Sequence, residues 1–100
     1  MSKQDFETTV NKTVTLTADP SDATARLADV AGSGYGSLAA SIKANADNTG
    51  VVYIRKYGSA GAWVPMAAGE AVTLIVKNLN DIEAYSENGT EALNIFLSVA

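Results

Sequence analysis

The side chains in this sequence that could do chemistry are carboxylates, hydroxyls, amides and aromatic rings, because the 100 residues include neither histidine nor cysteine. The usual general base, the usual nucleophile pairs and most transition-metal ligands are therefore missing. Two pairs of acids, Asp19 with Asp22 and Glu87 with Glu91, stand in turn-like segments whose oxygens could bind calcium. Neither pair lies in a loop of about twelve residues with alternating ligands. We interpret these acids as solvated turn residues, and we expect no metal, no cofactor and no catalytic site.

A glycine-rich segment, residues 32–37 with the sequence GSGYGS, has the composition of a loop that could cradle a phosphate. It lacks the Gly-Lys-Ser/Thr ending of the Walker motif, and its glycines do not follow the spacing of a dinucleotide-binding turn. We therefore interpret this segment as a connecting loop.

The formal net charge is −4, from 7 basic and 11 acidic residues. An acidic chain without a basic cluster argues against a nucleic-acid partner, since phosphates require a face rich in lysine and arginine. Lys43, Arg55 and Lys56 are the only basic residues close together, and we interpret them as solvated charges on strands.

The N-terminal sequence MSKQDFETTVNK contains no apolar stretch of the kind found in signal peptides. Nowhere does the chain approach the roughly 18 consecutive apolar residues of a membrane-spanning helix. We expect a soluble protein that is made in the cytoplasm and has no membrane partner.

Five aromatic residues suggest a binding function of another kind: Tyr35, Tyr53, Tyr57, Trp63 and Tyr85. Aromatic rings exposed on a β-sandwich can stack on sugars, so a carbohydrate-binding module is one candidate function. The interpretation we prefer is that Trp63 and Tyr53 fill the core or a subunit contact.

The elements that would position these side chains are short strands. Apolar residues alternate with polar ones, or gather in short β-branched and aromatic runs, throughout the chain. The clearest case is Val72, Leu74 and Val76, which alternate with Thr73 and Ile75. The pattern predicts strands over residues 13–18, 39–46, 51–54, 63–66, 72–77, 82–86 and 92–99, with a further short strand around Leu27 in the ambiguous segment 23–30.

Turn residues punctuate these strands. Asn48 and Gly50 tolerate positive φ and are expected to reverse the chain. Pro65 lacks an amide donor, which confines its strand to a sheet edge or a bulge. The Asn88-Gly89 pair is typical of a hairpin.

Seven or eight short antiparallel strands at roughly ten-residue spacing predict an all-β fold, a single small β-sandwich or jelly roll. Residues 1–11 are polar apart from Phe6 and Val10, so we expect an N-terminal arm that orders against a neighbour. The folded domain is then expected over residues 12–100.

Five segments between about residues 25 and 100 form a pattern: IKA at 42–44, NTGVVYI at 48–54, AAGEAVTL at 67–74, NLNDI at 78–82 and LNIFL at 93–97. Together they resemble a family of small structural proteins encoded by tailed bacteriophages. The sequence departs from the family pattern at Ala68, where proline is expected, and at Arg55, where glycine is usual.

The resemblance implies a non-enzymatic capsid decoration or cement protein, bound as a trimer to the major capsid protein on the virion surface. A tail, baseplate or head-fibre-base module is the alternative within the virion. Phe6, Val10, Tyr57 and Trp63 are the expected partner contacts.

Overall fold

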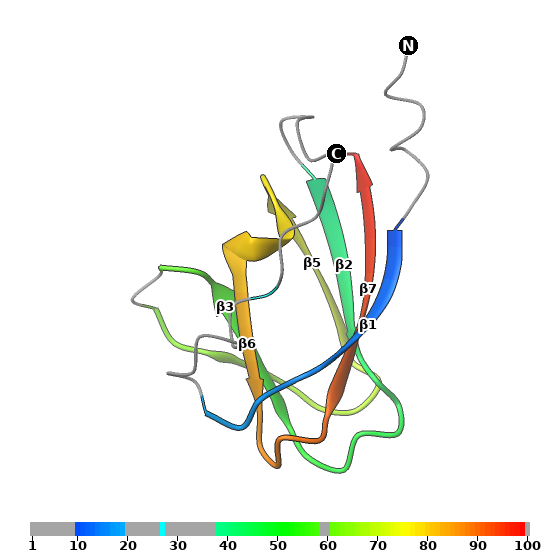
Figure 1. Ribbon diagram of the computed structural model, residues 1–100, viewed down its shortest axis with the longest axis vertical. Helices are drawn as coiled ribbons and strands as arrows, with labels where there is room; N and C mark the ends of the chain where they lie inside the picture. The colour runs from blue at the N-terminus through cyan, green and yellow to red at the C-terminus, as the bar shows by residue number, and fades with distance from the viewer. Residues whose placement is uncertain (1–9, 20–26, 28–37, 59–60, 100) are drawn as a thin grey trace.

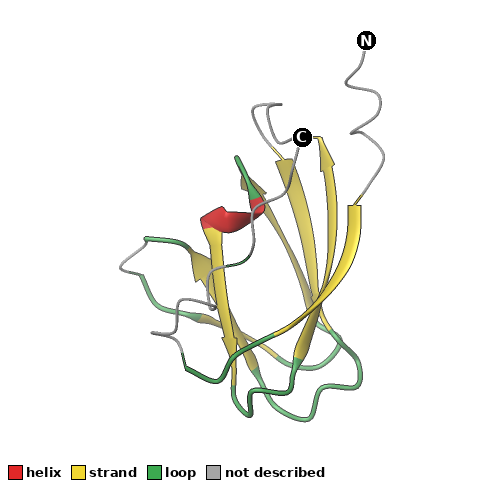
Figure 2. Cartoon of the chain, in the orientation of Figure 1, coloured by secondary structure: helices red, strands yellow, loops and turns green. Residues whose placement is uncertain are grey.

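Two antiparallel sheets form the described part of the chain, which comprises residues 10–19, 27, 38–58 and 61–99 of this computed structural model (Figure 1). The four-stranded sheet has the order β1-β7-β2-β5, and the three-stranded sheet has the order β4-β3-β6. A short 3-10 helix, η2, leads directly into β6 (Figure 2). The elements are β1 Val10–Thr15, β2 Leu38–Ala44, β3 Val52–Lys56, β4 Val64–Met66, β5 Ala71–Val76, η2 Leu79–Asp81, β6 Ile82–Ser86 and β7 Ala92–Val99. The all-β sandwich predicted from the sequence is confirmed.

The core lies between the two sheets and is built from alternate residues of each strand. Side chains on successive strand residues point to opposite faces, so a period-two pattern buries one set and exposes the other. In β7, for example, Ile95 is fully buried while the adjacent Phe96 is 46% exposed on the outer face. The buried apolar residues are Leu16, Leu27, Leu38, Ala40, Ile42, Ala44, Val52, Ile54, Met66, Val76, Leu79, Ile82, Ala84, Leu93, Ile95 and Leu97.

The first strand begins and ends earlier than the predicted range 13–18. It starts at Val10, so the last two residues of the predicted arm, 10 and 11, pair with β7. After Thr15 the chain leaves the four-stranded sheet: Leu16 N–H donates to Glu91 O, and the carbonyl of Thr17 then accepts from Ser86 N–H in β6. This passage from one sheet to the other explains why Ala18 is exposed, although it lies two residues after the buried Leu16.

The second strand also ends before the predicted limit of residue 46. Ala40, Ile42 and Ala44 are buried, whereas Ala46 is exposed in a turn closed by Asn48 N–H donating to Asn45 O. In the sequence, the alternation of apolar and polar residues continues through Ala44 and Ala46. The pattern alone therefore does not show where the strand ends.

The Asn88-Gly89 pair does not form the expected hairpin within one sheet. It lies between β6 and β7, which belong to different sheets, so residues 87–91 form a crossover. Gly89 does adopt positive φ, at 77°, which glycine tolerates because it has no Cβ. The prediction was correct about a turn and wrong about which strands it joins.

Asn48 and Gly50 lie where the chain was expected to reverse, but neither uses the positive φ that it tolerates. Among the described residues only Gly58, Gly69 and Gly89 have positive φ. Gly50 is required for a different reason, the close approach of a neighbouring loop, which is described with the site below.

The edge position of β4 is confirmed. Pro65 pairs with Tyr53 on one side, and no described strand lies on the other. Leu27, the centre of the uncertain strand at 23–30, is buried and donates its N–H to Ile82 O. The rest of that segment, the glycine-rich segment 32–37 and the arm residues 1–9 with Phe6 lie outside the described residues.

Replacing Ile95 by alanine should lower the free energy of unfolding by about 2–5 kcal/mol, because it leaves a cavity between the sheets. The adjacent Phe96→Ala variant is the matched control, and it should cost less than about 1 kcal/mol because its ring lies on the outer face. Urea denaturation of the two variants measures the difference. Equal losses would contradict the register of β7.

Candidate functional site

Five side chains gather on the outer face of the three-stranded sheet, and we call them the aromatic platform: Tyr53, Arg55, Trp63, Glu83 and Tyr85. Two pairs come from directly opposed positions of β3 and β6, since Tyr53 is the register partner of Tyr85 and Arg55 that of Glu83. Trp63 lies in the connection that precedes β4. The antiparallel register therefore places side chains from three segments on one surface.

The three rings contact one another in series. Tyr53 and Tyr85 are stacked, with ring centroids 4.8 Å apart and an interplanar angle of 17°. Trp63 meets Tyr85 edge to face, at 4.8 Å and 87°. Both distances lie in the range in which aromatic pairs attract beyond simple burial. The rings thus form a preorganised surface rather than three separate side chains.

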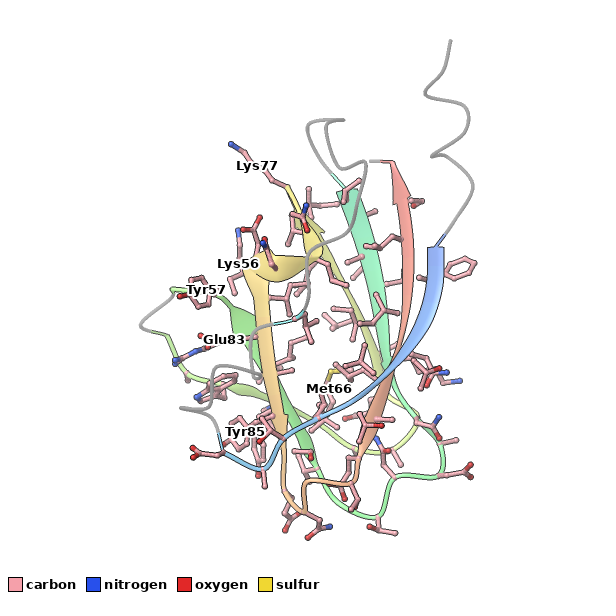
Figure 3. All side chains as sticks on the ribbon, in the orientation of Figure 1. Lys56, Tyr57, Met66, Lys77, Glu83 and Tyr85 are labelled. Atoms are coloured by element: carbon pink, nitrogen blue, oxygen red, sulfur yellow. The ribbon has the colours of Figure 1, made fainter. Side chains whose placement is uncertain are left out.

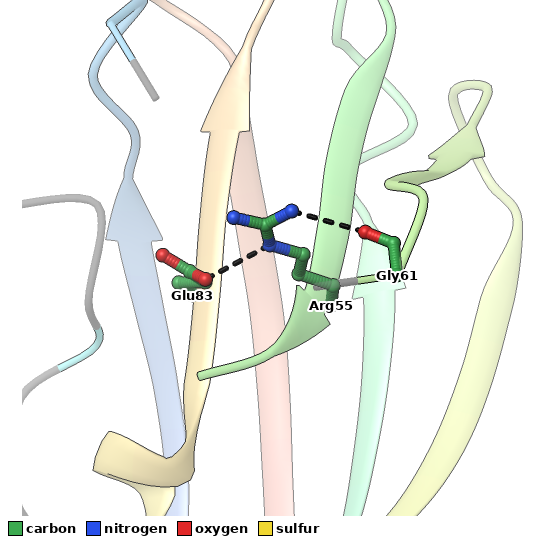
Figure 4. Close-up of polar contacts among 3 residues, drawn as sticks. All are labelled: Arg55, Gly61 and Glu83. Atoms are coloured by element: carbon green, nitrogen blue, oxygen red, sulfur yellow. Dashed lines mark hydrogen bonds and ion pairs between the residues drawn. The ribbon is translucent and has the colours of Figure 1, made fainter. Parts of the chain in front are cut away.

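Arg55 fixes this cluster to the hairpin between β3 and β4. Its Nε donates to Glu83 Oε2 at 2.9 Å, and its Nη1 donates to the carbonyl of Gly61 at 3.0 Å (Figure 4). The guanidinium carbon lies 4.1 Å from the centroid of the Trp63 ring, a cation–π contact. One side chain therefore joins β6, the hairpin loop and the indole.

The environment of Arg55 corrects the sequence interpretation of a solvated strand charge. Its side chain is 27% exposed, and that of Glu83 only 11%. Lys43 and Lys56, the other members of the supposed solvated group, are exposed as expected. Arg55 differs because its cross-strand partner is an acid, and that pairing depends on strand order.

The sequence-predicted contact residues are distributed over the molecule. Trp63 belongs to the aromatic platform, and Tyr57, directly after β3, is 50% exposed. Val10 begins β1 in the other sheet, and Phe6 lies outside the described residues. Trp63 and Tyr53 do not fill the core, one of the two roles expected of them, since both are half-buried on the outer face; a subunit contact stays a prediction.

Sequence reasoning missed the roles of Arg55 and Glu83. They are 28 residues apart and approach each other only because β3 pairs with β6. A signal was present in the alternation of β3: Tyr53 and Arg55 alternate with the buried Val52 and Ile54, and so share an outward face.

A second polar cluster, the Glu91 network, lies at the end of the sandwich where the chain crosses between sheets. The Glu91 side chain is buried, with 1% of the residue exposed. Its Oε1 accepts from Asn88 N–H at 3.0 Å, and its Oε2 accepts from the Asn88 side-chain amide at 2.8 Å and from the Thr49 hydroxyl at 3.3 Å. The carboxylate thus joins the β2–β3 loop to the β6–β7 loop.

Two further contacts complete the junction between these loops. The side chain of Asn48 exchanges two hydrogen bonds with the backbone of Ala92, accepting from its N–H at 2.9 Å and donating to its carbonyl at 3.0 Å. A Cβ added at Gly50 would lie 2.6 Å from Asn88 Nδ2 and 2.7 Å from Glu91 Oε2. Gly50 is therefore needed to leave room for the Glu91 network.

The network also determines the ionisation of Glu91. Burial by itself raises the pKa of the carboxyl, but hydrogen bonds from Asn88 and Ser86 outweigh burial and lower the pKa from 4.5 to about 2. The sequence interpretation of Glu91 as a solvated turn acid is therefore wrong. Its oxygens are occupied by donors of the protein, which is the arrangement of a structural carboxylate.

Comparisons with protein-family models, with curated proteins and with solved structures find no match. Within the described ranges, no group of three or more acids is arranged to hold a metal ion. No helix in the same ranges has the length and apolar character needed to cross a bilayer. The aromatic platform is the surface with the composition of a binding site, because Trp, Tyr and Arg are the residues enriched in interface hot spots.

Replacing Glu91 by glutamine should lower the free energy of unfolding by about 1–3 kcal/mol at pH 7, because one amide donor then faces the donors of Asn88. The folded-state pKa is depressed from 4.5 to about 2, so the stabilisation is fully present above about pH 4.5 and is lost as the pH falls toward 2. The difference in the free energy of unfolding between Glu91→Gln and the original chain should therefore shrink as the pH falls from 4.5 toward 2. Denaturation curves at several pH values measure it.

The exposed Glu87, in the same loop, supplies the control. Its carboxylate accepts one hydrogen bond, from Val51 N–H at 3.0 Å. Glu87→Gln should therefore cost less than Glu91→Gln. A pH-independent difference between Glu91→Gln and the original chain would contradict the ionised, buried carboxylate.

Arg55→Ala should loosen the aromatic platform, because it removes the contact with the indole and leaves Glu83 without its cationic partner. We expect a loss of about 1–3 kcal/mol in the free energy of unfolding. Trp63 is the sole tryptophan, so acrylamide quenching of its fluorescence reports on this site directly and should increase. Lys43→Ala, an exposed cation on the other sheet, should change neither quantity. Unchanged quenching in Arg55→Ala would contradict the contact.

Proposed function

We propose that this chain is a non-enzymatic structural protein of a tailed bacteriophage virion, a capsid decoration protein that attaches to the outer head shell through the aromatic platform. The sequence supports this proposal by its resemblance to small virion proteins and by lacking histidine and cysteine. The fold supports it by offering a rigid sandwich on which binding residues are displayed. The observation that carries the proposal is the preorganised cluster of Tyr53, Trp63 and Tyr85 around Arg55.

The cluster fits a protein partner well for two reasons. Its rings are already held by one another and by Arg55, so little side-chain entropy is lost when a partner binds. Its residues are half-buried before binding, which leaves part of each ring to be covered by the capsid. Exposed aromatic and arginine surface of this kind typically contributes most of an interface's free energy.

The same surface favours a protein over a sugar. Stacking on a sugar requires an open ring face, but Tyr53 and Tyr85 cover one face of each other, and Arg55 lies over the Trp63 ring. A carbohydrate-binding module is nevertheless the second candidate, because three contacting aromatic rings on the outside of a sheet are also what glycans recognise.

Quantitative mass spectrometry of purified particles, from the phage or induced prophage that carries the coding sequence, tests the virion assignment. Hundreds of copies per particle, relative to the major capsid protein, are expected of a head decoration protein. A handful would indicate a tail, baseplate or fibre-base module. Complete absence would overturn the proposal and leave glycan binding to be tested on an array.

Trp63→Ala and Tyr85→Ala should each weaken attachment to particles stripped of the protein by about 2 kcal/mol or more, equal to about 30-fold in Kd. Phe96→Ala is the matched control, since it removes an exposed ring from the opposite sheet. Co-sedimentation with particles measures binding, and circular dichroism verifies folding. Undiminished binding by both platform variants would contradict this surface as the attachment site.

A further inference from the structure

The four edge strands of the sandwich differ in how their open sides are protected. Exposed edges of natural proteins commonly carry charges, prolines or covering segments, because unpaired backbone groups recruit other strands. β4 contains Pro65, and β1 contains Lys12. Along β6, Leu27 N–H binds Ile82 O at one end, and Thr17 O binds Ser86 N–H at the other. Each of these three edges therefore has a device against pairing.

Among the described residues, the β5 edge has no such device. Its sequence, AVTLIV, contains neither charge nor proline, and within the described residues it pairs only with β2. Hydrogen-bonded and non-hydrogen-bonded pairs alternate along an antiparallel ladder. Ala44 N–H donates to Glu70 O in this register, so the backbone groups of Val72 and Leu74 face β2. Those of alternate residues, Ala71, Thr73 and Ile75, consequently face away from the sheet.

The open side of the sandwich next to β5 is also apolar. A cavity of about 540 Å³ lies between the sheets there, with Ile54 and Val64 on one wall and Val72 and Leu74 on the other. Val64 pairs with the buried Ile54 and therefore shares its inward face, yet it is 52% exposed. Val72 and Leu74 are only partly buried against the core. Inward-facing apolar side chains thus remain accessible along this side.

We propose that β5 pairs with β5 of a second copy, in antiparallel register centred on Thr73, to form a two-fold symmetric dimer. This register is the one that uses all of the outward backbone groups: Thr73 faces Thr73 of the second copy, and Ala71 faces Ile75. About six main-chain hydrogen bonds result, two from each of three pairs. The surface is self-complementary, as a two-fold interface requires.

The charges at the two ends of β5 fit the same register. Glu70 precedes the strand and Lys77 follows it, so in this register Lys77 of each copy stands opposite Gly69 of the other, one residue from its Glu70. Figure 3 shows Lys77 extending from the end of β5, near Lys56. A parallel arrangement would instead bring like charges together, which is unfavourable.

The two-fold axis also brings the open sides of the two sandwiches together. It is perpendicular to the shared sheet, so both three-stranded sheets lie on the same side of that sheet. The two cavities then face each other, and Val64 of each copy is covered. The partner is thus a second copy of this chain, and the inference does not depend on the proposed virion role.

The absence of cysteine makes a direct test possible. In a hydrogen-bonded antiparallel pair the Cα atoms are about 5.5 Å apart, within the range of a disulfide. Thr73→Cys should therefore cross-link as a dimer on mild oxidation, as seen by non-reducing electrophoresis. Thr13→Cys is the matched control, because Thr13 is an exposed threonine on the other edge strand of the same sheet. It should remain largely uncross-linked.

Sedimentation velocity provides the non-covalent test. The unmodified chain should sediment as a dimer at about 100 μM, and Thr73→Pro, which removes an outward amide donor, should be a monomer. Thr13→Pro should stay dimeric. Lys77→Glu and Glu70→Lys should each raise the dimer Kd about tenfold. Combining the two substitutions in one chain should return the Kd to that of the unmodified chain.

Three results would overturn the inference: a monomer at all concentrations, a trimer, or cross-linking of Thr13→Cys as efficient as that of Thr73→Cys. A chain that is monomeric alone but assembles on particles would refute the dimer and still support the proposed virion function. The two proposals therefore fail separately.

Discussion

The structure depends most on how the chain crosses between its two sheets, because no strand of one sheet is hydrogen-bonded to a strand of the other. Three of the crossings, β2 to β3, β4 to β5 and β6 to β7, lie at one end of the sandwich (Figure 1). The buried carboxylate of Glu91 holds two of these loops together with donors from both. A charge without its hydrogen bonds would be costly in this position, so the loops and the carboxylate stabilise one another only as a set. The buried apolar residues hold the two sheets together, while the Glu91 network fixes the loops through which the chain passes from one sheet to the other.

The aromatic platform shows the same dependence on long-range pairing. Alternation puts Arg55 and the adjacent, exposed Lys56 on opposite faces of β3, but no local signal shows which of them has an acid as its cross-strand partner. The register of β3 with β6 places Glu83 opposite Arg55, whereas the residue opposite Lys56 is Ile82. The guanidinium then has a carboxylate, a carbonyl and an indole within contact, and the hairpin loop is fixed with it. Arg55 is thus integrated into the fold and supports the surface proposed to bind.

The sequence was informative where the position of a residue in the fold depends on its neighbours along the chain. Alternation around Val72, Leu74 and Val76 showed which side chains face inward, because the strand period is fixed by backbone geometry. Pro65 indicated an edge because it lacks a donor, whatever its neighbours are.

The sequence was uninformative where the outcome depends on which strands are adjacent. The Asn88-Gly89 turn could equally have closed a hairpin, and Glu91 has the local setting of a solvated acid. Trp63 and Tyr53 could have filled a core, since aromatic residues are common in cores and on binding faces alike. Each of these questions requires the strand order, which a pattern of period two does not contain.

The Asn48-Thr49-Gly50 segment, noted first as part of a family resemblance, has a consequence for the evolution of this fold. Each residue serves the facing loop: Asn48 binds the backbone of Ala92, Thr49 binds Glu91, and Gly50 leaves space for both Glu91 and Asn88. The three positions and the acid therefore form one structural unit spread over two distant parts of the sequence. A lineage that lost the acid would no longer need glycine opposite it, so substitutions at these sites should accumulate together rather than singly.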